Sequence, residues 1–169
     1  KRPTQPKQLT WSTPVSRGGW LVSDYPKVTI TGGFTVGAGT AYPITGPIEG
    51  LGLPKLRVND VDRGHRDGAV AANDYYTTRV VSVPVAVLGA DIDDTLALLD
   101  DLTDNWAASD VDLDLTIELS ATRTMTFTGR PGASGVAPVE LDLTLLYAHP
   151  STATGLLTFR ALEPLETIT

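Results

Sequence analysis

The chain has 169 residues, 41% of them hydrophobic, no cysteine and a formal net charge of −7. This length and composition fit one large domain that buries its own core, and the lack of cysteine excludes disulfides and thiolate metal sites. The two histidines, His65 and His149, lie far apart in the sequence and do not suggest a zinc site or a catalytic triad. No apolar run approaches the roughly 20 residues that span a membrane. We therefore expect no cofactor, no metal and no membrane binding by this chain.

Charge is distributed unevenly along the chain. Residues 1–27 carry five basic side chains and one acidic one, whereas residues 89–120 carry nine Asp, one Glu and no Lys or Arg. Nucleic-acid binding needs basic density, so this pattern does not favour it. The acidic run is either a solvated helix face followed by the outer face of a strand, or one of two surfaces through which identical subunits attract each other.

Residues 1–19 are polar, contain several prolines and glycines, and show no hydrophobic periodicity. We expect an extended arm there that orders only against something else, with the folded domain over residues 20–169. Trp11 and Arg17 are candidate subunit contacts, because a large ring in such an arm usually anchors a neighbour.

The next part of the chain predicts short strands separated by Gly-rich connections. They are expected at 20–22, in two pieces over 27–36, briefly at 42–44 and from residue 56 to 61.

A long polar loop is then expected over residues 59–76. Loops of this length inside compact domains are usually functional or disordered. His65 has no nucleophile or metal partner at a suitable spacing, so we interpret its loop as a contact surface and not as a catalytic site. The candidate interface residues in it are Arg63, His65, Arg66 and Asp67.

Residues 79–106 predict a strand followed by a helix. Val81, Val83, Val85 and Val87 alternate on one face, and after Gly89 the hydrophobic period changes from two to about 3.6. Asp91 is the expected N-cap of a helix over about 91–106. Its predicted buried stripe consists of Ile92, Thr95, Leu96, Leu99, Leu102 and Trp106.

The aspartates of this helix have two interpretations. Asp91, Asp93 and Asp94 begin like a calcium loop, but the glycine and glutamate of an EF-hand are missing, so capping explains them better. Asp100, Asp101 and Asp104 lie toward the negative end of the helix dipole, where a basic partner would offset their cost. We expect them at a subunit interface, although a merely solvated face explains them as well.

Strands with one apolar face follow the helix. They are predicted over 111–119, 123–128, 139–147 and 156–162, with short turns between them. Only one helix is found, so a parallel α/β sheet is disfavoured. The sequence predicts a mainly β fold, an antiparallel β-sandwich with a single helix and an extended N-terminal arm.

Three segments in this order carry a family resemblance. They are I-E-G-L-G-L-P-K-L-R at 48–57, R-G-H-R-D-G at 63–68, and Y-Y-T-T-R at 75–79 leading into the valine strand and the helix. This order resembles the N-terminal domain of siphophage distal tail proteins, labelled minor tail proteins in actinobacterial phages. His149 stands before Pro150 where the family has Asp.

The resemblance implies a structural virion protein and not an enzyme. It implies a belt-like β-sandwich domain that assembles in the host cytoplasm into a ring, expected to be a hexamer, at the distal end of the tail tube. The implied partners are other copies of the chain, the tail tube protein and the tail-tip hub or a tail-associated protein. DNA would pass through the channel only in transit. Many members carry a second, galectin-like domain, for which the residues after Pro150 are too few.

Two alternatives stay open at this point. One is another structural protein of the tail tube or connector, and the other is a carbohydrate-binding β-sandwich module. The second would need exposed aromatic rings, and the three tryptophans are Trp11, Trp20 and Trp106.

Overall fold

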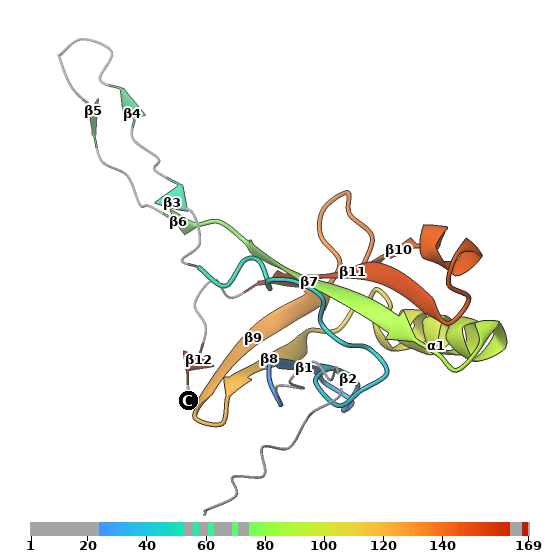
Figure 1. Cartoon of the computed structure of the whole chain (residues 1–169). Coiled ribbons are helices and arrows are strands. Elements are labelled where there is room, and N and C mark those ends of the chain that lie inside the picture. Colours follow the sequence, from blue (N-terminus) through green and yellow to red (C-terminus); the bar gives the residue numbers. More distant parts are fainter. Residues whose placement is uncertain are drawn as a thin grey trace, which may run out of the picture.

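The computed structural model describes residues 24–52 and 77–162, together with the backbone of short strands at 56–57, 61–62, 69–70, 75–76 and 167–168 (Figure 1). The strands are β1 Lys27–Ile30, β2 Thr35–Gly37, β3 Leu56–Arg57, β4 Val61–Asp62, β5 Ala69–Val70, β6 Tyr75–Tyr76, β7 Arg79–Leu88, β8 Leu113–Ser120, β9 Arg123–Pro131, β10 Val139–Asp142, β11 Thr152–Ala161 and β12 Thr167–Ile168. The helices are α1 Ile92–Asn105 and the 3₁₀ helix η1 Thr144–Tyr147.

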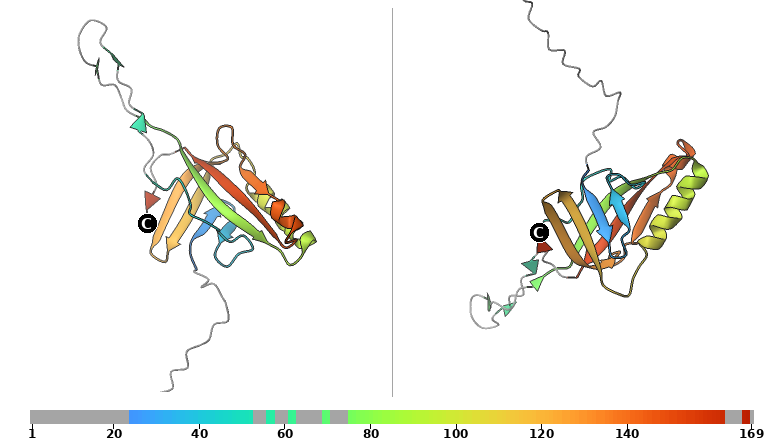
Figure 2. Two further views of the ribbon diagram at one scale, coloured as in Figure 1. Left: turned by 45° about the horizontal axis from the view of Figure 1, so that its top comes forward. Right: turned by 90° about the horizontal axis from the view of Figure 1, so that it is seen from below.

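One eight-stranded antiparallel sheet forms the body of the molecule. β11 pairs with β7 along its full length, with β10 over residues 154–157 and with β9 at residues 160–161. The sheet continues from β9 through β8 and β1 to β2. The chain after β2 returns to the free side of β7, where Ile44 and Glu49 bridge to Val85 and Ser82. The sheet therefore curls until it is nearly closed, as both views of Figure 2 show. The predicted mainly β antiparallel fold with one helix is confirmed, and its two layers belong to a single curled sheet.

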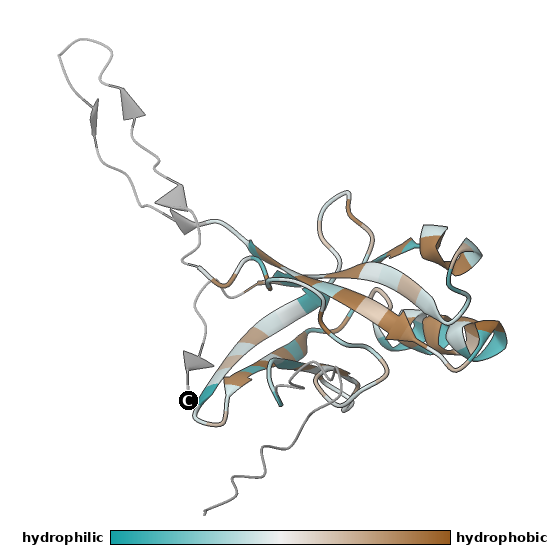
Figure 3. Cartoon of the chain, viewed as in Figure 1, coloured by the Kyte–Doolittle hydropathy of each residue, from teal (hydrophilic) through white to brown (hydrophobic). Residues whose placement is uncertain are grey.

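The alternating strands bury their predicted faces. All four inward valines of β7, together with Leu115 and Ile117 on β8, have no exposed surface. Hydropathy alternates in the same way along β8 and β9 (Figure 3). The hairpin of β1 and β2, predicted as two pieces around Gly32-Gly33, is also present.

Helix α1 begins where its capping residues predict. The Asp91 carboxylate accepts a hydrogen bond from the Asp94 backbone N–H at 2.9 Å, and the Asp94 carboxylate accepts one from the Ala90 N–H at 2.7 Å. The first bond gives a partner to an N–H that a helix N-terminus leaves unpaired, and the second connects the first turn to the residue before the N-cap. Thr95, Leu99, Leu102 and the C-cap Trp106 are buried, so α1 covers the open side of the sheet.

The predicted buried stripe of α1 is wrong at two positions. Ile92 is 46% exposed and Leu96 is 44% exposed, because α1 turns its Thr95–Leu99–Leu102 line toward the sheet. Leu98, which was not in the predicted stripe, is half-buried against the core.

The predicted strand over 139–147 is also wrong in its second half. β10 ends at Asp142, whose Oδ1 accepts a hydrogen bond from the Thr144 backbone N–H at 2.9 Å. That turn leads into η1, in which Tyr147 is 95% exposed. Local side-chain bonding of this kind competes with strand pairing, and among the described residues β10 pairs along only one edge.

Two other boundaries differ from the prediction. Val111 is 68% exposed and precedes β8, which begins at Leu113. The last long strand begins at Thr152, earlier than the predicted residue 156, because it pairs with all ten residues of β7.

The segment predicted as a long polar loop contains paired strands. Leu56 and Arg57 pair with Tyr76 and Tyr75, while Val61 and Asp62 pair with Val70 and Ala69. Residues 56–76 therefore include two short antiparallel ladders.

Candidate assembly surfaces

Most of the predicted interface residues lie outside the part of the chain that the structure describes. These are Trp11, Arg17, Arg63, His65, Arg66 and Asp67, and their role stays a prediction. The short strand expected at 20–22 also lies outside it. The structure does place the three predicted interface residues of α1, Asp100, Asp101 and Asp104, all of them exposed.

Asp100 and Asp104 lie on the solvent side of α1, in its C-terminal half. The last turn of α1 contains no basic residue that would interact favourably with the negative end of the dipole. Within the described residues, no ion pair reaches either carboxylate. These two side chains are therefore available to a basic partner.

Asp101 has a role within the chain. Its Oδ2 accepts a hydrogen bond of 2.7 Å from the Tyr42 hydroxyl, which also bonds to the Leu98 carbonyl at 3.2 Å. The Asp101 Oδ1 accepts a further bond from the Asn105 amide at 2.9 Å. Burial, followed by the bond and the negative charge of Asp101, raises the pKa of Tyr42. Asp101 thus connects α1 to the segment after β2 by a hydrogen bond. Its replacement would therefore alter the stability of the fold as well as any interface.

Exposed apolar side chains gather at the end of the molecule where β7 runs into α1. The Gly89 N–H donates to the Ser151 carbonyl at 3.0 Å, and Leu88 pairs with Thr152, so the chain after η1 lies beside the start of α1. Figures 1 and 2 show η1 and α1 at this same end. The exposed residues, here called the apolar end, are Leu88, Ile92, Leu96, Leu143, Leu145 and Tyr147.

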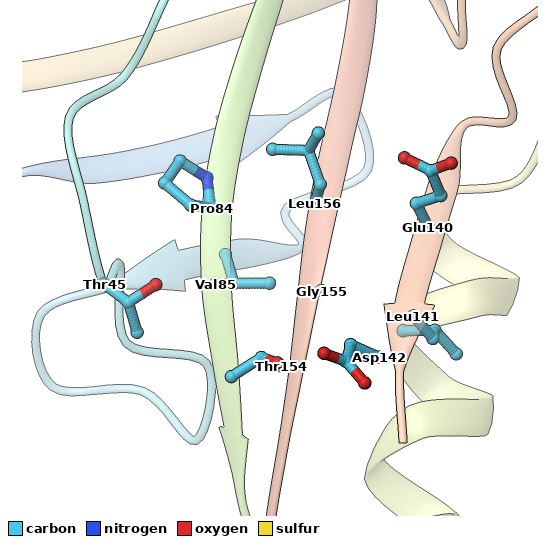
Figure 4. A pocket seen from close by; sticks show the side chains of 9 residues that line it. All are labelled: Thr45, Pro84, Val85, Glu140, Leu141, Asp142, Thr154, Gly155 and Leu156. Atoms are coloured by element: carbon cyan, nitrogen blue, oxygen red, sulfur yellow. The ribbon is translucent and has the colours of Figure 1, made fainter. Parts of the chain in front are cut away.

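A trough of about 300 Å³ crosses the outer face of β7, β11 and β10 (Figure 4). Pro84 and Leu156 supply its apolar surface, while Glu140 and Asp142 stand on the β10 side. No basic residue belongs to its lining. The full lining is Thr45, Pro84, Val85, Glu140, Leu141, Asp142, Thr154, Gly155 and Leu156.

The β10 side of the trough is acidic, and a hydrogen bond to Asp142 and a close approach at Gly155 define its geometry. Both carboxylates are exposed, and the hydroxyl and backbone N–H of Thr144 lower the pKa of Asp142 by hydrogen bonding. Gly155 lets β11 lie close to β10 at this point. A Cβ at this position would lie only 3.1 Å from the Glu140 carbonyl oxygen. A continuous strand over residues 139–147, as predicted, would not contain this turn, so the sequence did not predict this surface. The spacing of Asp142 and Thr144, typical of an Asx turn, was the signal available.

The described residues contain no cluster of three or more potential metal ligands. Nor does any helix among them have the length and apolar character needed to cross a membrane. Trp106 is fully buried and so presents no ring for stacking on a sugar. The trough lining contains no aromatic residue either.

Comparison with known proteins gave a match in structure but not in sequence. No family model matches the chain, and neither does any curated protein. A solved structure does: the Dit protein of phage SPP1, described as a paradigm of the hub adsorption apparatus in phages that infect Gram-positive bacteria, with a TM-score of 0.59 at 14% identity. The chain is therefore similar in fold to the SPP1 Dit protein. The match covers 84% of this chain and 51% of the SPP1 protein, so the chain spans about half the length of that relative.

This structural match confirms the fold that the resemblance implied. The sequence identity of 14% is too low for residue roles to be transferred, so the match assigns no function to any single side chain of this protein.

Proposed function

We propose that this protein is a structural component of a siphophage tail, of the actinobacteriophage type. In this proposal, copies of the chain form a ring, expected to be a hexamer, between the last ring of the tail tube and the tail-tip hub. The observation that carries it is the fold shared with SPP1 Dit over 84% of this chain. The order of the three sequence segments described above supports the same family independently of the structure.

The surfaces described above suit a ring. Each contact in a ring is head-to-tail, so every subunit needs two different surfaces that complement each other. The basic arm is one such surface by charge, and the acidic surfaces of the domain, α1 among them, are its counterpart. The apolar end adds area that a monomer would leave in water. An acidic surface facing a channel would also keep DNA from adhering during transit.

Native mass spectrometry and negative-stain microscopy of the purified full chain test this proposal. We expect a mass near six times 17.9 kDa and particles with a central opening. If the chain stays monomeric alone and also as part of isolated tails, the proposal is wrong.

A pair of variants separates the acidic helix from general charge effects. Asp104→Lys should weaken ring formation, whereas Glu49→Lys makes the same charge change on an exposed residue away from α1 and should leave it intact. Equal behaviour of the two variants would remove α1 from the interface.

A further inference from the structure

The trough on the outer face of β7, β11 and β10 has an apolar and acidic lining, which restricts the kind of segment that can bind there. Its surface combines apolar groups of Pro84 and Leu156 with the carboxylates of Glu140 and Asp142, and its lining has no Lys or Arg. Figure 4 shows both carboxylates rising from β10, beside Gly155 and Leu156. A segment that fits must therefore carry positive charge next to an apolar side chain.

One segment of this chain has that composition. Residues 1–23 contain Lys1, Arg2, Lys7 and Arg17 and no acidic residue, which gives this segment a net charge of +4. Leu9 and Trp11 lie between the basic positions, and Pro3, Pro6 and Pro14 favour an extended backbone.

We propose that the trough receives residues 1–23 of a second copy of this chain. In the bound state, an apolar side chain of that segment lies on Pro84 and Leu156, and its basic side chains pair with Glu140 and Asp142. This inference rests on the proposed ring, since it makes the arm and the trough a complementary pair of surfaces of the kind that a head-to-tail contact requires.

The position of the trough is consistent with an arm that comes from a neighbour. The described chain starts at Asp24, just before β1, and β8, β9 and β11 lie between β1 and β10 in the sheet. Length does not decide the matter, because 23 extended residues can span at most about 80 Å. The experiment must therefore distinguish an arm from the same chain from an arm of another.

Cross-linking is well suited to this question because the natural chain has no cysteine. Full-length Leu9→Cys chains are mixed with full-length Thr154→Cys chains and oxidised, and a chain with both substitutions is oxidised at high dilution. Thr122→Cys, an exposed position in the β8–β9 turn, replaces Thr154→Cys in the control mixture. We expect a cross-linked dimer in the first mixture and little or none in the control.

A second variant tests the charge argument without disturbing the turn. The double substitution Glu140→Gln and Asp142→Asn keeps an oxygen that can accept the Thr144 hydrogen bond while removing both charges. Loss of two exposed ion pairs should weaken the association about two- to thirtyfold, read as the concentration needed for half-maximal cross-linking.

Three results would overturn this inference: no cross-link between mixed chains, a cross-link only within the double-cysteine chain, or equal cross-linking to Thr122→Cys. Ring-sized particles that form without the arm–trough cross-link would refute this contact and leave the proposed function standing. A cross-link between chains that never form closed rings would instead refute the proposed function.

Discussion

Trp106 and Thr158 join the helix to the sheet across 52 positions of sequence. The indole Nε1–H donates a hydrogen bond of 3.1 Å to the Thr158 carbonyl oxygen, and both residues are buried. The same oxygen also accepts a bond from the Gly132 N–H at 2.7 Å. The side chain that ends α1 therefore fills the core and bonds to the strand that runs between β7 and β9.

Replacing Trp106 should separate the packing contribution from the hydrogen bond. We expect Trp106→Ala to lower the free energy of unfolding by about 3–5 kcal/mol, as large-to-small core changes do. Trp106→Phe keeps most of the ring and leaves the Thr158 oxygen with its second donor, so it should cost only about 1–2 kcal/mol. Urea denaturation measures both. Equal losses in the two variants would mean that ring packing is not the main contribution.

Leu99 and Leu96 offer a matched test of how α1 faces the sheet. Leu99 is 4% exposed and Leu96 is 44% exposed, although both were expected in one stripe. Leu99→Ala should cost about 2–5 kcal/mol, whereas Leu96→Ala should cost less than about 1 kcal/mol. Thermal unfolding followed by circular dichroism compares them. A larger loss for Leu96→Ala would show that the helix is rotated relative to this account.

The Tyr42–Asp101 contact predicts a loss of stability at alkaline pH. The pKa of Tyr42 is raised in the folded protein, so the folded state holds this proton more tightly than the unfolded state does. The resulting stability is fully present below the ordinary tyrosine pKa of about 10 and is lost as pH rises above that value. Tyr42→Phe should cost about 1 kcal/mol at neutral pH. Its stability should fall less steeply than that of the natural chain above pH 10, and parallel pH profiles would contradict this.

Gly129 marks the place where β9 reaches β11. A Cβ there would collide with the Arg160 carbonyl oxygen and lie 2.8 Å from the Ala161 Cα, both of them backbone atoms. Gly129→Ala should therefore cost at least about 2 kcal/mol. Gly52→Ala is the control, since a Cβ at Gly52 meets nothing within 4 Å, and its effect should stay within about 0.5 kcal/mol. Chemical denaturation of both variants checks the difference. A neutral Gly129→Ala would show that β9 and β11 do not approach so closely.

The strand and helix over residues 79–106 could be predicted because each local signal agreed with the packing. Valines alternate along β7, Gly89 separates the two elements, and Asp91 caps α1 as its position suggests. An element can be predicted from sequence when its local propensities, its hydrophobic pattern and its tertiary packing all favour the same structure.

The predictions failed where burial depends on partners far away in the sequence. Leu141, Leu143 and Leu145 alternate like inward residues of a strand. In the described part of the chain, however, β10 pairs along only one edge, and the Asp142–Thr144 turn ends it. Helical periodicity likewise marks a broad apolar side of α1 and does not determine which part of it the sheet will cover.

The candidate site was predictable only in outline. Uneven charge along the chain indicated an assembly role, and Asp100 and Asp104 do lie on an exposed face. The trough depends on β7, β11 and β10 meeting in one face, which no local pattern reveals. The bond between Asp101 and Tyr42 joins residues 59 positions apart and was equally hidden.

Labelling of intact particles tests the central claim most directly. Gold-conjugated antibodies against this chain are applied to phage particles that contain it, and the positions of the gold are recorded by negative-stain microscopy. A structural ring between the tail tube and the hub predicts gold at the tail end opposite the capsid. Gold along the whole tube, at the capsid or only on free protein would contradict the account.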